Sequence, residues 1–246
     1  MNDLNLHLSY ALMVMLGMAL IVAFRPVSHL TCAERAHYYR LQAVTLIGAV
    51  VGAKLAVLMG DALWPLRPFP GWTALLTSGR SIAGALLFGF LLAEACKPLL
   101  NYRLPPNDRF AMGLPISIAV GRIGCWLSGC CLGVEMDGPL AVRGLDGIPR
   151  FPAPLAEIVF HVTAGVALIA LWRRKKMAGR LFAVFLVAYG IYRFGSEFWR
   201  ITPKAFWGLS AYQWLSLCMA VAGGTALYLR RDRSGSRAMP LPMESV

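Results

Sequence analysis

The sequence has few charged residues. Only 15% of its 246 residues are charged, whereas an ordinary soluble domain has about 25%. It also has only 6 cysteines, too few for a disulfide-dense secreted module. Instead, 58% of the residues are hydrophobic and the mean hydropathy is +0.60. This composition excludes a disordered chain and a typical cytosolic enzyme, and it predicts an all-α, polytopic membrane protein.

Acidic residues are scarcer than basic ones. Twelve Asp and Glu stand against 24 Lys and Arg, so the net charge is +12 and the pI is about 9.9. Binding to nucleic acid would need these cations gathered on one soluble face. They fall between long apolar runs instead, and we therefore expect them to set membrane topology, with no nucleic-acid partner.

Seven runs are long and apolar enough to cross about 30 Å of hydrocarbon. They are Leu6–Phe24, Leu41–Gly60, Ile82–Leu99, Ala111–Ser128, Ala153–Trp172, Leu181–Trp199 and Tyr212–Leu229. We expect residues 1–230 to form one domain of seven transmembrane helices. The polar residues 231–246 are predicted to be a disordered cytoplasmic tail.

The distribution of Lys and Arg orients the spans. Fifteen lie in the connections on one side and six in those on the other, and the richer side is cytoplasmic. The N-terminus is therefore predicted outside and the C-terminus inside. The first ten residues, MNDLNLHLSY, contain no Lys or Arg, so the first span is not predicted to be a cleavable signal peptide.

Three cations lie inside predicted spans, each in the half nearer the outer face: Lys54, Arg122 and Arg193. A basic residue at the centre of a membrane helix costs roughly 2.5–3.5 kcal/mol. One interpretation is that they form internal ion pairs that fix helix packing. The other is that an excess of positive charge at one depth binds an anion, and a phospholipid phosphate is the anion expected there.

Acidic residues accompany these cations at helical spacing. Glu197 lies one turn beyond Arg193 and Arg200 follows one turn later, which predicts a single stripe along the sixth span. Glu157 and His161 are likewise four residues apart on the fifth span. His161 is a candidate base, although a histidine in a membrane helix more often serves packing.

The densest motif is GRIGCWLSGCCLG, from Gly121 to Gly133. Its four glycines predict either close helix packing or a break in the helix that lines a cavity. Its three cysteines, Cys125, Cys130 and Cys131, are candidates for thiol chemistry, because Arg122 nearby favours a thiolate. The alternative is that they pack as small hydrophobic residues.

Two motifs resemble those of the prolipoprotein diacylglyceryl transferases. The first is Gly121-Arg122-Ile123-Gly124 with Gly129 and Gly133, and the second is YGIYRFGSEFWR, which carries Tyr189, Arg193, Glu197 and Arg200. Weaker similarities are Tyr10, Gly52-Ala53-Lys54, Ser78-Gly79, and Pro152 with Glu157. The resemblance extends over nearly the whole chain.

The resemblance implies a bacterial inner-membrane enzyme of lipoprotein biosynthesis. Members move the diacylglyceryl group of phosphatidylglycerol to a cysteine thiol of a secreted lipoprotein precursor, and no metal or other cofactor is needed. It implies catalytic roles for Arg122, Arg193 and Glu197. It implies substrate binding by Tyr10, Lys54, Gly124, Gly129, Gly133, Glu157, Tyr189 and Arg200.

The sequence departs from the family pattern at several polar positions. The family's histidine in the third span corresponds to Ala83, and its hallmark asparagines and glutamate correspond to Cys125, Ser128 and Cys130. A second hypothesis is therefore a non-catalytic phospholipid-binding or transport protein on the same fold. A third hypothesis, a membrane thiol–disulfide or quinone-linked enzyme that uses the cysteines, is disfavoured because the adjacent cysteines lack the Cys-x-x-Cys spacing.

Overall fold

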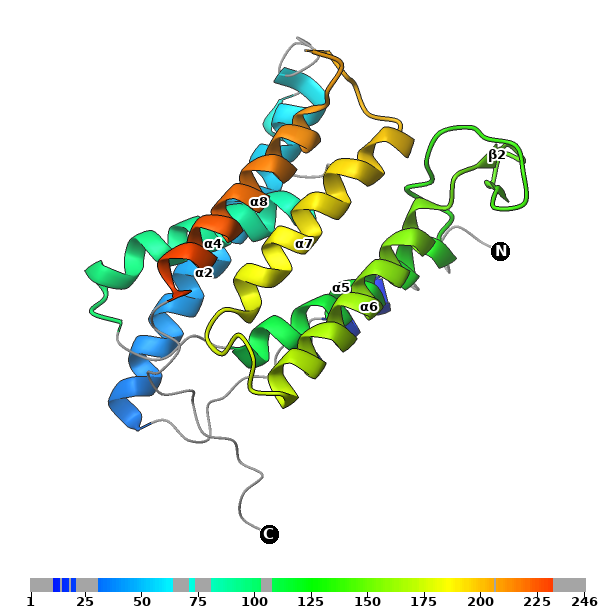
Figure 1. The fold of residues 1–246 in the computed structure, drawn as a ribbon. Helices are drawn as coiled ribbons and strands as arrows, with labels where there is room; N and C mark the ends of the chain where they lie inside the picture. The colour runs from blue at the N-terminus through cyan, green and yellow to red at the C-terminus, as the bar shows by residue number, and fades with distance from the viewer. Residues whose placement is uncertain are drawn as a thin grey trace. The chain divides into compact units, whose positions relative to one another are not determined.

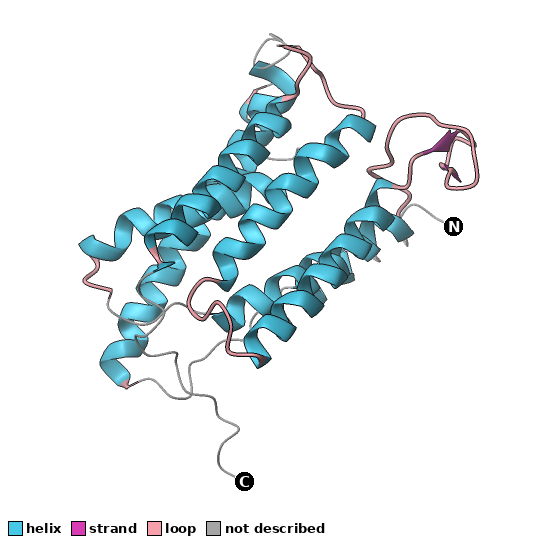
Figure 2. Ribbon diagram, in the orientation of Figure 1, coloured by secondary structure: helices cyan, strands magenta, loops and turns pink. Residues whose placement is uncertain are grey.

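The computed structural model describes residues 11–13, 15–17, 19–20, 31–63, 71–73, 81–102, 108–205 and 207–231. These residues are mostly helical (Figure 1 and Figure 2). The helices are α2 (Cys32–Leu58) with the π-helical turn η2 (Met59–Leu63), α4 (Ile82–Leu99), α5 (Asp108–Leu127), α6 (Ala153–Arg173), α7 (Leu181–Ser196) with the 3-10 turn η3 (Glu197–Trp199), and α8 (Ala211–Leu229). Two short strands, β1 (Val142–Arg143) and β2 (Pro149–Arg150), form an antiparallel pair. The prediction of an all-α chain is confirmed.

Helix boundaries follow local capping signals as well as hydrophobicity. Helix α4 has the bounds predicted for the third span, and Ser81 caps it by accepting the Gly84 N–H at 3.2 Å. Helix α2 begins well before the predicted Leu41, because Thr31 and Glu34 form a capping box. The carboxylate of Glu34 accepts the Thr31 N–H at 2.8 Å. The apolar run thus predicted only part of a longer helix.

Within the described residues, five segments are long and apolar enough to cross a membrane: Glu34–Asp61, Ile82–Leu99, Phe110–Leu127, Ala153–Arg173 and Leu181–Trp199. Helix α8 is not among these five. The predicted first span, Leu6–Phe24, lies mostly outside the described residues. The chain is therefore a multi-pass membrane protein by these helices, while the number seven stays a prediction.

The chain divides into two compact units. Unit 1 comprises Met1–Arg25, Asn107–Phe182 and Phe198–Ile201, and it contains α5, the strand pair and α6. Unit 2 comprises Pro26–Pro106, Ala183–Glu197 and Thr202–Val246, and it contains α2, α4, most of α7, and α8.

In unit 2, glycines allow helices α2 and α4 to approach closely. A β-carbon added at Gly84 would lie 2.5 Å from the Ala56 β-carbon, and one added at Gly52 would lie 2.6 Å from the Gly84 carbonyl oxygen. No side chain fits at such distances without moving the helices. Small residues at helix contacts are the usual means of packing in lipid, where water does not drive association.

Helices α7 and α8 of unit 2 meet in the same way. A β-carbon at Gly190 would stand 2.8 Å from the Ser216 carbonyl oxygen, and one at Gly223 would stand 2.9 Å from that of Ala183. Helix α8 begins at a second capping box, in which Ser210 accepts the Gln213 N–H and the Gln213 side chain accepts the Ser210 N–H.

In unit 1, the first residue of α5 anchors the start of α7. The Asp108 carboxylate accepts the Gly179 N–H at 2.5 Å and the Leu181 N–H at 3.3 Å. A carboxylate at this position satisfies donors that a helix N-terminus leaves unpaired and complements the helix dipole.

The connection between α5 and α6 forms a small hydrogen-bonded layer. The Gly133 N–H donates to the Phe151 carbonyl at 2.8 Å, and the Val134 N–H donates to that of Trp199 at 2.9 Å. The rings of Phe151 and Trp199 stack with their centroids 5.9 Å apart. This layer joins the glycine-rich segment after α5 to the segment that follows α7.

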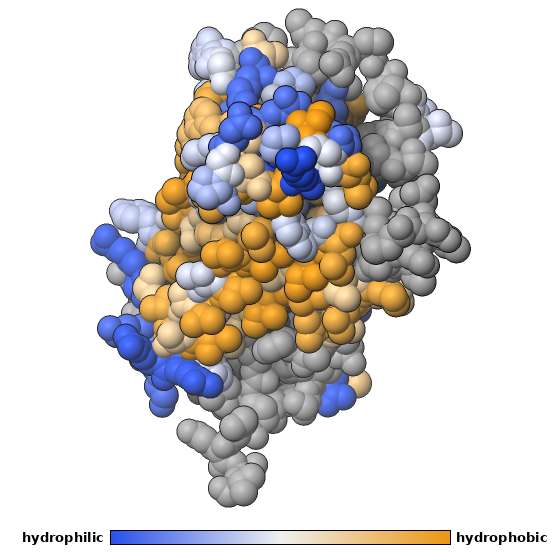
Figure 3. Space-filling model, turned by 90° about the vertical axis from the view of Figure 1, so that its right-hand side faces the viewer, coloured by the Kyte–Doolittle hydropathy of each residue, from blue (hydrophilic) through white to orange (hydrophobic). Residues whose placement is uncertain are grey.

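Helix α6 turns its polar residues inward and its apolar residues outward. Glu157 and His161 are buried, whereas 63% of Val166 is exposed, and Val159 and Val162 are also exposed. Figure 3 views the molecule from the side of this helix and shows a broad apolar band with hydrophilic side chains above and below it. Such a surface is suited to lipid, because water would penalise it.

The glycine contact of α2 and α4 yields a stability prediction. Gly52→Ala is expected to destabilise the protein by about 1–3 kcal/mol, because its β-carbon overpacks the crossing with α4. The matched control is Gly224→Ala on α8, where a β-carbon meets no atom within 4 Å. The control is expected to be neutral or up to about 1 kcal/mol more stable, since alanine favours helix. Thermal unfolding in detergent measures both, and equal melting temperatures would contradict the contact.

Candidate functional site

A buried carboxylate lies between two arginines in unit 1. Glu157, on α6, is 1% exposed; it forms an ion pair with Arg122 of α5 through the arginine Nε. Its other oxygen lies 3.5 Å from Nη1 of Arg200, which follows η3. The two arginine side chains are only 12% and 17% exposed. One carboxylate thus neutralises one of two guanidinium groups, and this cluster carries a net charge of about +1, since arginine stays protonated.

His161 lies one helical turn beyond Glu157 and is fully buried. Its ring meets the Phe160 ring edge-on, with centroids 5.2 Å apart. The predicted i, i+4 relation on α6 therefore places both side chains on the buried face of the helix. Its role as a base stays a prediction.

A second buried ion pair lies in unit 2. Nη2 of Arg193 is 2.9 Å from Oε2 of Glu197, as the i, i+4 spacing predicted. The Glu197 side chain is fully buried, and its other oxygen accepts the Thr202 hydroxyl at 2.7 Å and the Ser210 hydroxyl at 3.3 Å. These donors hold the carboxylate in one orientation toward Arg193.

The predicted stripe of Arg193, Glu197 and Arg200 is wrong in its last member. Helix α7 ends at Ser196 and Glu197 begins the 3-10 turn η3, so Arg200 does not lie on the helix. It reaches Glu157 instead. The 3-10 turn η3 is tighter than an α-helix, so the residues after it do not continue the stripe of α7. Arg200 is then paired with the buried carboxylate of Glu157 on α6.

The three cysteines of the glycine-rich motif come together where α5 ends. Their sulfur atoms all lie within 4.8 Å of one another; Cys125 is buried, Cys130 half-buried and Cys131 exposed. Gly129 and Cys131 have positive φ angles of 62° and 63°, which turn the chain back toward the helix. Helix α5 itself continues to Leu127, so these turns follow the helix, and the predicted break that lines a cavity stays a prediction.

The surroundings of Cys130 favour its thiolate. Hydrogen bonds from the thiols of Cys125 and Cys131 lower the pKa of Cys130, and the Ser128 hydroxyl and the charge of Arg122 act in the same direction. The Ser128 hydroxyl donates to the Cys130 sulfur at 3.2 Å, and Nη1 of Arg122 lies 3.7 Å from the Cys125 sulfur.

The glycines of this motif have different environments. A β-carbon at Gly133 would lie 3.0 Å from that of Phe151, so close approach is needed there. At Gly121 a β-carbon would meet no atom within 4 Å, so close packing does not account for this glycine. The carbonyl oxygen of Gly124 accepts the Ser128 hydroxyl at 2.9 Å. Substrate binding by Gly124, Gly129 and Gly133 stays a prediction.

The remaining predicted site residues have different surroundings. Lys54 is half-buried on α2. Tyr189 is fully buried on α7, where its ring stacks on Phe185 with centroids 5.9 Å apart, so it belongs to the packed interior of unit 2. Tyr10 and Ser78-Gly79 lie outside the described residues.

Sequence reasoning missed several polar partners. Thr202 and Ser210 hold Glu197 in place, and the Tyr212 hydroxyl donates to Asp61 at 3.2 Å. The spacing Ser-x-x-Gln at residues 210–213 is a helix-start signal that would have identified Ser210 as ordered. Nothing in the sequence pairs Asp61 with a residue 151 positions away.

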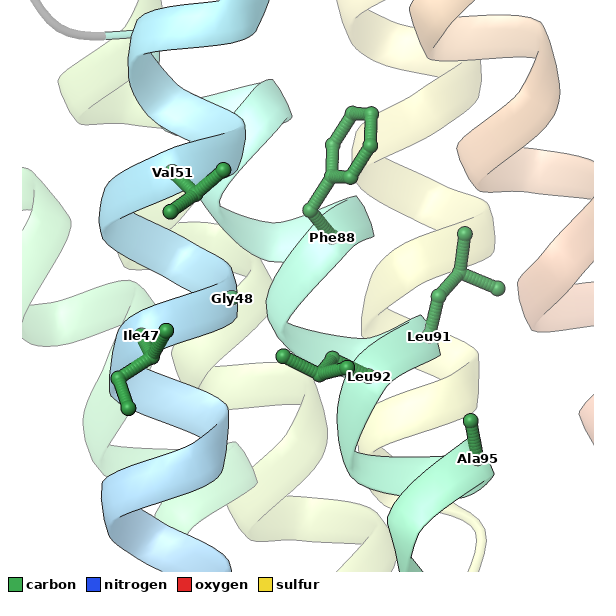
Figure 4. Close-up of a pocket in the computed structure, with 7 residues that line it drawn as sticks. All are labelled: Ile47, Gly48, Val51, Phe88, Leu91, Leu92 and Ala95. Atoms are coloured by element: carbon green, nitrogen blue, oxygen red, sulfur yellow. The ribbon is translucent and has the colours of Figure 1, made fainter.

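An apolar groove of about 390 Å³ lies between α2 and α4 of unit 2 (Figure 4). Ile47, Gly48 and Val51 line it from α2, and Phe88, Leu91, Leu92 and Ala95 line it from α4. Only hydrocarbon fits this lining, and it contains no group that could bind phosphate or move a proton.

Comparison with known proteins gives consistent results. The profile of one family, described as prolipoprotein diacylglyceryl transferase, matches residues 3–229. A phosphatidylglycerol–prolipoprotein diacylglyceryl transferase of Bordetella parapertussis is 32% identical over 249 aligned positions, which cover 93% of this chain and 92% of the relative. The enzyme of the same name from Cupriavidus pinatubonensis is 34% identical over 70% of this chain and 65% of its own length. A Clostridium perfringens enzyme, numbered 2, is 28% identical over 75% of each chain.

A buried ion pair and an exposed one should respond differently when a glutamate is replaced by glutamine. Glu157→Gln is expected to destabilise the protein by about 3–5 kcal/mol, because it leaves the buried Arg122 without its counter-charge. Glu135→Gln is the matched control, since Glu135 is 68% exposed and lies 4.0 Å from Arg150. Its loss is expected to be at most about 1 kcal/mol. Thermal unfolding in detergent measures both, and equal losses would contradict the role of Glu157.

Proposed function

Because the chain belongs to the prolipoprotein diacylglyceryl transferase family, we propose that it transfers the diacylglyceryl group of phosphatidylglycerol to a cysteine thiol of a prolipoprotein. The resemblance recognised in the motifs around Arg122 and Arg193 is confirmed by the family match. The observation that carries the proposal is the buried cluster of Arg122, Glu157 and Arg200, with more positive than negative charge.

The reaction requires a charge to be stabilised as it develops. The acceptor sulfur forms a bond with the glyceryl carbon that carries the phosphate, while the bond between that carbon and the phosphate oxygen breaks. Glycerol phosphate leaves with the electron pair, and the thiol proton is released to water. The phosphate changes from a diester with one negative charge to a monoester that carries a further charge.

Arginines suit this step because they stay charged and bind phosphate oxygens with several N–H donors. Glu157 holds Arg122 and Arg200 in fixed positions, so little reorganisation is needed when the phosphate departs. We assign Arg122 and Arg200 of unit 1 to phosphate binding, and for Arg193 of unit 2 we expect the same role from the family resemblance of its motif alone. Buried sites with few competing waters strengthen such interactions.

Glu197 acts as a positioning residue in this proposal. Its carboxylate is fully buried and accepts two hydroxyl groups in addition to its ion pair with Arg193. A carboxylate with its oxygens so occupied is better suited to orient the arginine than to take up a proton.

The proposal includes the membrane arrangement. Residues 1–230 form one transmembrane domain of seven spans with the N-terminus outside, and residues 231–246 are a cytoplasmic tail. The location is the bacterial inner membrane, with the phospholipid bilayer as both surroundings and source of the donor. The distribution of Lys and Arg over the connections supports this arrangement.

Removal of either arginine should abolish transfer. Arg122→Ala and Arg193→Ala are each expected to lower turnover at least ~100-fold, the usual effect of deleting a group that stabilises developing charge. Turnover is measured in detergent with phosphatidylglycerol labelled in its glycerol headgroup and a cysteine-containing lipoprotein peptide. The readouts are released glycerol phosphate and the mass of the peptide. Arg174→Ala, in the exposed connection after α6, is the control and should match the wild type.

Near-normal turnover in a monodisperse Arg122→Ala protein would overturn this assignment. The same assay also tests the hypothesis that the protein binds phospholipid without catalysing a reaction. A wild-type protein that retains phosphatidylglycerol through purification but releases no glycerol phosphate would be a lipid-binding protein.

Reporter fusions test the orientation. A fluorescent protein fused after Val246 should fluoresce, because it folds in the cytoplasm, and alkaline phosphatase at the same position should be inactive. Phosphatase fused after Gly138, in the connection between α5 and α6, should be active because that connection is predicted outside. The reverse pattern would show that the topology is inverted.

A further inference from the structure

The three cysteines at the end of α5 form a cluster that the proposed transfer reaction does not use. Cys125 lies in the last turn of the helix, and the turn at Gly129 brings Cys130 and Cys131 back to it. All three sulfur atoms lie within 4.8 Å of one another. Each of the three thiols can supply one sulfur ligand to a single metal ion placed between them.

We propose that Cys125, Cys130 and Cys131 bind one thiophilic divalent cation of the zinc class. Zinc–sulfur bonds are about 2.3 Å long, so three sulfurs around one ion stand about 4 Å apart. The observed separations need only a small contraction to reach this geometry. The sequence alone gave no reason to expect a metal, because Cys-x4-Cys-Cys lacks the usual spacing of zinc motifs.

Charge balance favours a divalent ion. Binding releases the thiol protons, and three thiolates around one Zn²⁺ leave a net charge of about −1 on the cluster. The guanidinium of Arg122, 3.7 Å from the Cys125 sulfur, offsets that charge. The Ser128 hydroxyl donates to the Cys130 sulfur at 3.2 Å and supports it from outside the coordination sphere. Zinc with three protein ligands keeps a fourth position for water.

A disulfide explains the cluster less well. Cys130 and Cys131 are consecutive, so their Cα atoms are about 3.8 Å apart, closer than the 4.4–6.8 Å usual for disulfides. A disulfide from Cys125 to either of them would leave the third sulfur beside it with no role. A trigonal set of thiolates uses all three.

Metal binding would also tie the loop to the helix. The cysteine turn leads directly to Gly133, whose N–H bonds to Phe151 in the layer that also contains Trp199. An ion that joins the end of α5 to this loop would fix the segment that begins only three residues after Arg122. The site is thereby placed to stabilise unit 1.

The test uses the full-length protein, purified in detergent, fully reduced, and kept free of oxygen. Zinc alone is added in competition with a chromophoric chelator, and retained zinc is counted by elemental analysis after gel filtration. We expect one zinc per chain in the wild type. Cys130→Ser and Cys131→Ser should each weaken binding at least ~100-fold, since even changes outside the coordination sphere cost 10–100-fold.

Cys218→Ser is the matched control, because Cys218 is exposed on α8 of unit 2 and should leave zinc binding unchanged. Cys131 is also exposed, so its substitution removes a ligand without opening the protein interior. Gel-filtration profiles and melting temperatures without zinc check that each variant is folded.

Three results would overturn the proposal. One is a wild-type protein that retains no stoichiometric zinc. Another is a Cys131→Ser protein that binds zinc as the wild type does. The last is a protein purified without reductant whose mass and peptide map show a disulfide within the trio, and which binds no zinc after reduction. None of these readouts depends on transfer activity.

Discussion

Burial of the Glu157 carboxylate between two arginines is the interaction on which unit 1 depends. An uncompensated charge inside a membrane protein is strongly destabilising, so each of these side chains requires the others. The three come from α5, from α6 and from the segment after η3. The pairing therefore fixes how these segments meet.

In unit 2 the buried charges are also paired, but by a residue one helical turn away. Arg193 and Glu197 are one turn apart, and hydroxyl groups from Thr202 and Ser210 occupy the remaining oxygen of the carboxylate. Around this pair the helices approach through glycine contacts, such as Gly190 against α8. Small residues and satisfied polar groups are what hold helices together when lipid replaces water.

The glycines of the glycine-rich motif have two different structural roles, and the sequence alone does not show which glycine has which role. Gly129 takes a positive φ and turns the chain, whereas Gly133 lets the backbone approach Phe151 and pair with it. Gly121 has open space beside it and does neither. Cys125, Cys130 and Cys131 come together because of the turn at Gly129 and Cys131, and helical spacing alone would not bring them together.

The sequence by itself predicted the helices from their hydrophobic runs and the family from its motifs. It also predicted the pairing of Arg193 with Glu197 from helical periodicity. Each of these signals is local in the sequence. Capping boxes, also local, explain why α2 begins earlier than its apolar run. Only the tertiary structure decided that Arg200 leaves the helix stripe for Glu157 and that three thiols meet. Those outcomes depend on which distant segment supplies the better partner for a buried group, and sequence spacing carries no information about that choice.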